Sequence, residues 1–181
     1  MIRAGLILDE LRRQQVTDVL GVPDNASKAL LDLLAAEPAI RVLTVTREGE
    51  AFAIASGLWV GGRTPVVLIQ NTGLLEAGDA LRGTATRMRV PLVCLVTVRG
   101  HARMAARGLR PSPETLSAER LSEPGLDSVA LLTEPTLRAW GVPWEVLSSE
   151  ADLPRLGAAF RRAREGEQPV AVLITSDTVA P

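Results

Sequence analysis

The sequence has little of the chemistry that most metal sites and disulfide frameworks need, with one cysteine and one histidine in 181 residues. One cysteine cannot form a disulfide within the chain, and these two residues cannot supply a Cys/His zinc site. A single histidine also excludes the HExxH signature of metalloproteases. Any Ser–His–Asp triad would depend on His101 alone.

Aromatic residues and excess charge are also scarce. The chain has three Trp, two Phe and no Tyr, and its formal net charge is −1, from 20 basic and 21 acidic residues. Proteins that bind nucleic acids use basic surfaces against the phosphates and aromatic side chains against the bases. We therefore expect no nucleic-acid partner.

Long apolar runs and nucleotide-binding glycine motifs are absent as well. No run approaches the roughly 20 residues of a membrane span, and Asp9 and Glu10 interrupt any signal-peptide core. The sequence contains neither GxGxxG nor GxxxxGK[ST], so it supports neither a Rossmann dinucleotide site nor a P-loop. We expect a cytoplasmic protein with no membrane partner.

In the sequence, short apolar runs typical of strands alternate with segments that have the periodicity of amphipathic helices. Hydrophobic residues make up 46% of the chain, too many for a disordered protein, and the length suits one domain over residues 1–181. The pattern predicts strands at 16–20, 40–45, 65–69, 91–98, 144–147 and 170–174. It predicts helices at 6–15, 27–36, 48–60, 74–87, 129–140 and 153–164, with a looser stretch at 99–125. This order indicates an α/β fold, a three-layer α/β/α sandwich with a mostly parallel sheet.

Polar residues directly follow several of these strands, at 21–25, 46–48, 70–73 and 99–100. Ligands of open parallel sheets bind at the carboxyl ends of the strands. These segments are therefore the candidate site.

Glu48 is the most informative of these residues. It opens a helix of small residues that runs through Ala51, Ala55 and Gly57, and such a helix allows close approach of a neighbouring element or subunit. A carboxyl group there would be poorly solvated, so we expect its pKa to rise and the group to hold or share a proton. The alternative is an acid favoured only by the helix dipole.

The other polar segments each admit two interpretations. Gln70, Asn71 and Thr72 could orient a ligand while Gly73 lets the backbone approach, or they could be a helix cap with a turn glycine. The segment 21–24 could be a rigid turn or the lip of a pocket.

Arginines recur at 99, 103, 107 and 110. They could form one cationic face for a carboxylate, phosphonate or sulfonate, or belong to a solvated, mobile loop. We interpret His101 as a surface residue, and Cys94, within an apolar strand, as an inert core residue.

Several ordered motifs together resemble one family. They are Gly21-Val22-Pro23-Asp24, then Arg47-Glu48-Gly49-Glu50-Ala51, then Gln70-Asn71-Thr72-Gly73-Leu74. They are similar to the pyrimidine-binding (PYR) domain of thiamine-diphosphate enzymes, above all the sulfopyruvate decarboxylase alpha subunit and the phosphonopyruvate decarboxylases. Gly141-Val142-Pro143-Trp144-Glu145 and Gln168-Pro169-Val170 extend the likeness over nearly the whole chain.

The resemblance implies a role for each candidate residue. Glu48 would bind N1′ of the cofactor's aminopyrimidine and stabilise its imino tautomer, whose nitrogen removes the thiazolium proton. Carbon dioxide would then leave a 2-oxo acid bonded to the thiazolium. The residues implied to bind the cofactor are Gly21, Pro23, Asp24, Gln70, Asn71, Thr72 and Gly73, and those implied to bind substrate are Asn25 and Arg99. A carboligase subunit and a non-catalytic PYR-like module remain the alternatives.

The resemblance also implies a second protein subunit. The family holds Mg²⁺ and the diphosphate with a Gly-Asp-Gly motif and a later Asn. The most similar segment of this sequence is Gly78-Asp79-Ala80, inside a predicted helix. We expect no metal ligand in this chain, because a diphosphate-binding (PP) beta subunit would hold the Mg²⁺ and the diphosphate. The active enzyme would be a hetero-oligomer.

This sequence departs from the family pattern near Glu48. The family's Asn before the Glu is Arg47 here, and Glu76 and Asp79 stand where the family has Asn. Acids at 76 and 79 would disfavour a strongly anionic substrate if their side chains faced the pocket. The identity of the 2-oxo acid therefore stays open.

Overall fold

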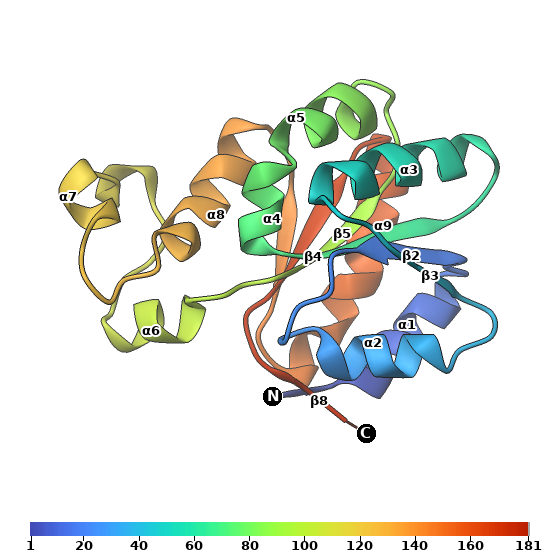
Figure 1. Cartoon of the computed structure of the whole chain (residues 1–181), viewed down its shortest axis with the longest axis horizontal. Coiled ribbons are helices and arrows are strands. Elements are labelled where there is room, and N and C mark those ends of the chain that lie inside the picture. The colour runs from blue at the N-terminus through green and yellow to red at the C-terminus, as the bar shows by residue number, and fades with distance from the viewer. Residues whose placement is uncertain (181) are drawn as a thin grey trace.

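Six parallel strands form the central sheet of the computed structural model, which describes residues 1–180 without the side chain of Thr115 (Figure 1). In spatial order they are β3 (Arg41–Thr44), β2 (Asp18–Gly21), β4 (Pro65–Gln70), β5 (Val93–Thr97), β7 (Val170–Ile174) and β6 (Trp144–Leu147). A separate parallel pair, β1 (Ile2–Arg3) and β8 (Thr178–Val179), joins the two ends of the chain.

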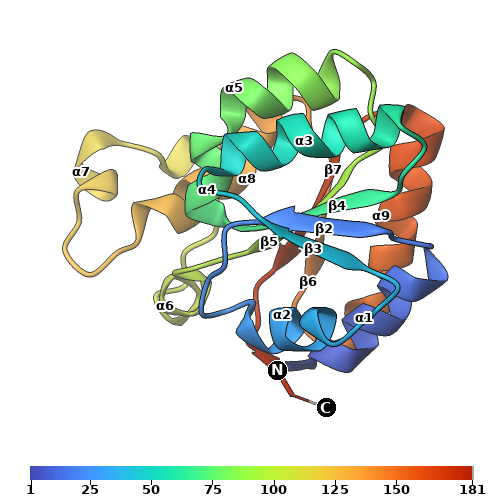
Figure 2. The same cartoon turned by 45° about the vertical axis from the view of Figure 1, so that its right-hand side comes forward.

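Helices cover both faces of the sheet, as Figures 1 and 2 show. One face carries α1 (Ala4–Arg13), α2 (Lys28–Ala35) and α9 (Leu153–Gly166). The other carries α3 (Glu48–Val60), α4 (Asn71–Glu76), α5 (Gly78–Ala80), the π-helix η1 (Leu81–Thr86) and α8 (Ser128–Ala139). The predicted three-layer α/β/α sandwich with a mostly parallel sheet is confirmed.

The central strands are buried on both faces, which explains their continuous apolar sequence. In β4, Val66 and Leu68 belong to the core under α1, α2 and α9, whereas Val67 and Ile69 belong to the core under α3, α4 and α8. Successive side chains of a strand point to opposite faces, so each face of this strand needs apolar residues. Cys94 of β5 is buried in the second core, as predicted.

Residues between β5 and α8 form an arm at one end of the sheet (Figure 1). It contains three short helical pieces that the sequence analysis did not predict, α6 (His101–Ala106), the 3-10 turn η2 (Pro113–Thr115) and α7 (Ala118–Leu121), joined by irregular chain. Met104, Ala130 and Leu131 make its small core, against which Leu109, Leu116, Leu121 and Leu126 pack. A further 3-10 turn, η3 (Glu150–Asp152), precedes α9.

The single helix predicted at 74–87 is three consecutive pieces, α4, α5 and η1. The ring of Trp140 lies against Gly78, where an added Cβ would come within 2.6 Å of the indole. Tertiary packing of this kind overrides helical periodicity. Among the described residues no helix has both the length and the apolar character needed to cross a membrane.

A buried carboxylate, that of Asp18, stands at the first residue of β2. Asp18 is fully buried, and it pairs with Arg41 (Nη2–Oδ1 2.7 Å) and Arg63 (Nε–Oδ2 2.8 Å). Burial acts to raise the pKa of Asp18, but hydrogen bonds from Arg63, Thr17 and Arg41 outweigh it and hold that pKa below its ordinary value. The ionised form of Asp18 therefore belongs to the folded state.

Candidate functional site

Glu48 is the first residue of α3, and its side chain lies against Gly73 of α4. A Cβ placed on Gly73 would come within 2.3 Å of both Cγ and Oε1 of Glu48, so only glycine leaves room for this carboxyl. Glu48 is half-buried, and no residue in the described part of the chain hydrogen-bonds to its carboxyl oxygens. The fold thus presents one uncommitted acceptor at the carboxyl edge of the sheet.

A second acid holds the backbone that leads into α3. The Glu50 carboxylate accepts hydrogen bonds from Thr46 N (3.0 Å), Thr46 Oγ1 (3.0 Å) and Arg47 N (3.3 Å). These bonds keep the pKa of Glu50 below its ordinary value. Glu50 is therefore a capping residue that sets how the chain enters the helix.

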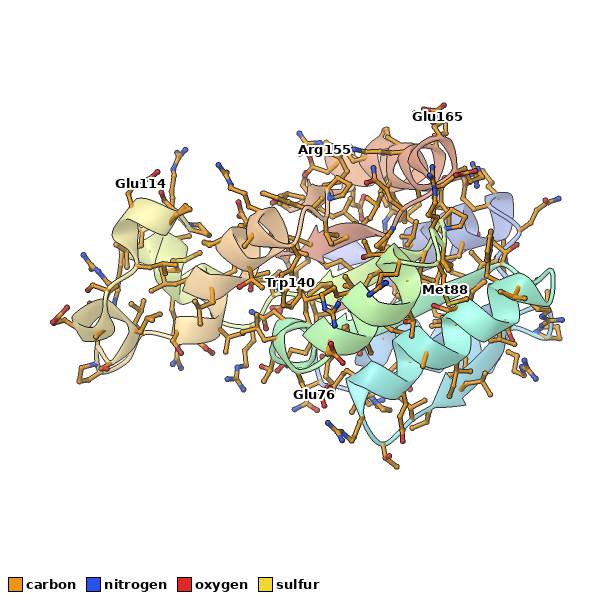
Figure 3. All side chains as sticks on the ribbon, turned by 90° about the horizontal axis from the view of Figure 1, so that it is seen from above. Glu76, Met88, Glu114, Trp140, Arg155 and Glu165 are labelled. Atoms are coloured by element: carbon orange, nitrogen blue, oxygen red, sulfur yellow. The ribbon has the colours of Figure 1, made fainter. Side chains whose placement is uncertain are left out.

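A third acid, Glu76 of α4, reaches across to the same turn (Figure 3). Its Oε1 accepts from Arg47 Nε (3.0 Å) and Nη2 (2.5 Å), and its Oε2 accepts from Gly49 N (3.1 Å). The Arg47 guanidinium is the main reason that the pKa of Glu76 is lowered. Neither Arg47 nor Glu76 was predicted to belong to the site, although both were recognised as departures from the family pattern.

A cleft of about 600 Å³ lies beside this edge, where β4, β5 and β7 end and α6 begins. Among the residues that line it are Asn25, Gln70, Arg99, His101, Arg103 and Asp127. The structure thus brings together Asn25, Gln70 and Arg99, three residues that the sequence assigned to cofactor or substrate. Glu48 and Gly73 are not among the residues that line this cleft.

The arginines of this region do not form one cationic face. Arg99 pairs with Asp127 (Nε–Oδ2 2.8 Å) and Arg107 pairs with Glu123 (Nη1–Oε1 3.0 Å). Arg103 lines the cleft, and no described residue forms an ion pair with it. Arg103 is therefore available to a negatively charged ligand.

His101, interpreted from the sequence as a surface residue, lies in the wall of the cleft. It is half-buried and lines the cleft, and it also lines a second cavity, between α6 and α8. Burial lowers the pKa of its imidazole. The ring is therefore predominantly neutral at pH 7, since an unperturbed histidine already titrates near 6.5.

Two of the predicted cofactor residues have structural bonds of their own. Asp24 accepts from Ala26 N (2.6 Å), Ser27 N (3.0 Å) and Thr97 Oγ1 (3.1 Å), so it shapes the turn before α2 and ties this turn to β5. Asn71 is fully buried, and its amide donates to Arg99 O (3.1 Å) and accepts from Arg99 N (3.2 Å). Asn71 thus fixes the start of the segment that carries Arg99.

The remaining predicted residues lie along the same edge. Gly21 ends β2 so close to β4 that a Cβ there would come within 1.7 Å of Leu68 O. Pro23 and Asn25 are exposed in the following turn. Thr72 Oγ1 donates to Gln70 Oε1 (3.1 Å), which orients the Gln70 amide. Their contact with a cofactor stays a prediction.

The segment Gly78–Ala80 is a turn of helix, as predicted. The Asp79 side chain is 90% exposed and pairs with Arg82 of the next turn. Within residues 1–180 no three His, Cys, Asp or Glu side chains cluster closely enough to hold a metal ion.

Fold and site together define a ligand-binding α/β domain, with an unpaired carboxylate and a polar cleft at the carboxyl ends of a parallel sheet. Residues 3–119, more than half of the chain, match the family model described as "Thiamine pyrophosphate enzyme, N-terminal TPP binding domain". The chain belongs to this family.

Curated relatives agree with the assignment. The chain is 30% identical over 184 aligned positions to a phosphonopyruvate decarboxylase of Streptomyces viridochromogenes, covering 99% of this chain and 42% of that protein. It is 33% identical over 81 positions to the sulfopyruvate decarboxylase subunit alpha of Methanothermobacter thermautotrophicus, covering 45% of this chain and 49% of that subunit. The chain thus spans about half or less of the relatives that it matches.

A solved structure shows the same fold. The benzoylformate decarboxylase of Polynucleobacter necessarius superposes with a TM-score of 0.69 at 23% identity, covering 100% of this chain and 32% of that one. This likeness establishes the fold, which is that of a domain from a much longer enzyme chain.

Proposed function

We propose that this chain is the PYR-domain subunit of a thiamine-diphosphate-dependent 2-oxo acid decarboxylase, in which Glu48 binds N1′ of the aminopyrimidine. The observation that carries the proposal is the uncommitted Glu48 carboxyl, held over Gly73 at the carboxyl edge of the sheet. A carboxyl without an internal partner can accept or donate one proton at a ring nitrogen.

The residues of this edge fit an aminopyrimidine. Glu48 would hold the proton at N1′, and the polar groups of Gln70 and the 21–25 turn would orient the ring. The bound cofactor would supply a thiazolium carbon that bonds to the 2-oxo acid and takes up the electron pair left when carbon dioxide departs. Coverage of the half-buried Glu48 by a partner would exclude water from its carboxyl group.

The adjacent cleft suits an anionic substrate. Arg103, which has no ion-pair partner among the described residues, places positive charge in it, whereas the charge of Arg99 is balanced by Asp127. The neutral imidazole of His101 can exchange a proton there. Glu76 is bound to Arg47 and Asp79 to Arg82, and neither acid lines the cleft. Glu76 and Asp79 therefore do not oppose an anionic substrate in this cleft, which Asp127 and Asp177 also line. We propose a 2-oxo acid with a second acidic group, such as the substrates named for the curated relatives.

The cofactor's other end requires a partner. We propose that a PP-domain beta subunit holds Mg²⁺ and the diphosphate, so that the active site lies between unlike chains. Several relatives are named as alpha subunits, and Gly78–Ala80 is a helical turn rather than a loop open to a metal. Carboligation by the same site, and a non-catalytic module, are the alternatives.

Calorimetric titration of thiamine diphosphate and Mg²⁺ into this chain, with and without its partner, tests the proposal. We expect binding only in the complex, and a loss of turnover of at least about a hundredfold in Glu48→Gln, because a misplaced or missing proton carrier costs 10²–10⁴-fold. Asp32→Asn is the control, since Asp32 is exposed and its one ion pair within the described residues is with Lys28. Absence of binding in the complex would leave the non-catalytic module.

A further inference from the structure

The two residues on either side of Glu48 are both bound by one side chain from another helix. Arg47, before Glu48, donates to Glu76 Oε1, and Gly49, after it, donates its backbone N–H to Glu76 Oε2 at 3.1 Å. The carboxylate of Glu76 thus binds the side chain of the residue before Glu48 and the backbone of the residue after it.

The same face of α4 also contacts the Glu48 side chain itself. Gly73 and Glu76 are three residues apart in α4 and so share one face of the helix. Gly73 provides the surface on which the Glu48 carboxyl lies, and Glu76 holds the turn that carries it. One helix face therefore sets both the position of the Glu48 backbone and the space for its side chain.

We infer that Glu76 is a positioning residue for Glu48, keeping the first turn of α3 at a fixed distance from α4 so that the Glu48 carboxyl stays over Gly73. The inference rests on the proposed function, because the position of Glu48 matters most if this carboxyl binds the cofactor. Arg47 completes the arrangement by neutralising the charge of Glu76 beside a second carboxyl group.

This contact adds little to global stability. The Arg47 side chain is 73% exposed and that of Glu76 34% exposed, and ion pairs at such surfaces contribute little to folding. Loss of the contact should therefore leave the fold intact and loosen only the turn. A displacement of about 1 Å in a group that acts on a ligand can cost on the order of a hundredfold in rate.

Three variants separate the positioning role from a structural one. Glu76→Ala removes the bonds to Arg47 and to Gly49, and Glu76→Gln keeps an acceptor for Gly49 N–H but loses the charge. Asp79→Ala removes a comparable acid that pairs with Arg82 and bonds to no described residue of α3. The readouts are amide hydrogen exchange at Gly49, the unfolding midpoint of the chain, and the dissociation constant of thiamine diphosphate with Mg²⁺ in the complex with the partner.

In Glu76→Ala we expect exchange at Gly49 to accelerate at least about tenfold and thiamine diphosphate to bind about tenfold more weakly, with an unfolding midpoint like that of Asp79→Ala. Glu76→Gln should recover much of the Gly49 protection and of the affinity. Affinity unchanged in Glu76→Ala, or lost only in step with the midpoint, would overturn the inference. If the wild-type complex binds no thiamine diphosphate, the proposed function fails; unchanged Gly49 exchange in Glu76→Ala would show separately that Glu76 does not hold the turn.

Discussion

At the scale of single residues, Gly73 makes the position of Glu48 possible. Gly73→Ala would bring a Cβ within 2.3 Å of the Glu48 side chain, which must then rotate away from α4. We expect this variant to fold and to lose at least about tenfold in thiamine diphosphate affinity in the complex, measured by calorimetry.

Gly83→Ala is the matched control for Gly73→Ala. It lies in η1, and a Cβ there meets nothing within 4 Å. A helical Gly→Ala change without strain leaves stability unchanged or raises it by about 0.5–1 kcal/mol. Equal affinities in the two variants would show that the Glu48 position does not depend on the missing side chain of Gly73.

Asp18 makes the stability of the fold depend on pH. Its pKa is lowered in the folded chain, so its contribution is fully present above the unfolded value of about 3.9 and is lost as the pH falls through the folded value. We expect Asp18→Asn to lower the free energy of unfolding by about 2 kcal/mol at pH 7, since charged hydrogen bonds to Arg41 and Arg63 are lost.

Denaturant unfolding of wild type and Asp18→Asn at a series of pH values checks this prediction. The difference between the two proteins should shrink below about pH 4, because acid protonates the wild-type carboxyl and removes the same charge. A difference that stays constant down to pH 2 would contradict the assignment.

At the scale of elements, the sequence predicted the strands better than the helices. Runs such as 65–69 identify strands buried on both faces, and all six strands of the central sheet lie where the sequence predicts them. The break between α4 and α5 was not predictable, because it depends on Trp140 packing on Gly78 from a distant segment. The pairing of β1 with β8 was also missed, because a strand of two residues is too short to show a hydrophobic periodicity.

The location of the candidate site could be predicted from the sequence, but the hydrogen bonds between its residues could not. The rule that ligands bind at the carboxyl ends of parallel strands selects Asn25, Glu48, Gln70 and Arg99 from the sequence. The hydrogen bonds of Glu76 to Arg47 and Gly49 join residues that are far apart in the sequence, so no local sequence pattern predicts them. The opposite charges of Arg47 and Glu76, both in place of the family's Asn, were the one available signal.

The arm between β5 and α8 is the element with the least apolar support. Among the described residues its core has three buried side chains, Met104 of α6 and Ala130 and Leu131 of α8, so its local opening should require much less free energy than global unfolding. We expect trypsin under native conditions to cleave first after Arg103, Arg107 or Arg120, detected by mass spectrometry. First cleavage in α9, which is also rich in arginine, would contradict this order.

At the scale of the whole molecule, sheet topology explains where the site lies. The chain runs from β2 outward to β3 and then crosses to β4 on the other side of β2, so strand order reverses between β2 and β4. At such a reversal the connections leave in opposite directions and open a crevice. Asn25 follows β2 and Gln70 ends β4, so both residues lie at this crevice.

Because Cys94 is buried, the rate at which its thiol reacts with a labelling reagent reports the opening of the fold. Cys94 is the only cysteine in the sequence and is 1% exposed in β5, and burial raises the pKa of its thiol. A thiol reagent can reach it only when the sheet opens, so its labelling rate measures the population of open molecules. We expect labelling about 10³-fold or more slower than for an exposed thiol, faster in Asp18→Asn, and slower again when a ligand binds the folded chain. Because Cys94 is native to the chain, the labelling kinetics can be followed on the unmodified sequence. Rapid labelling of the wild type would mean that the centre of the sheet opens without global unfolding.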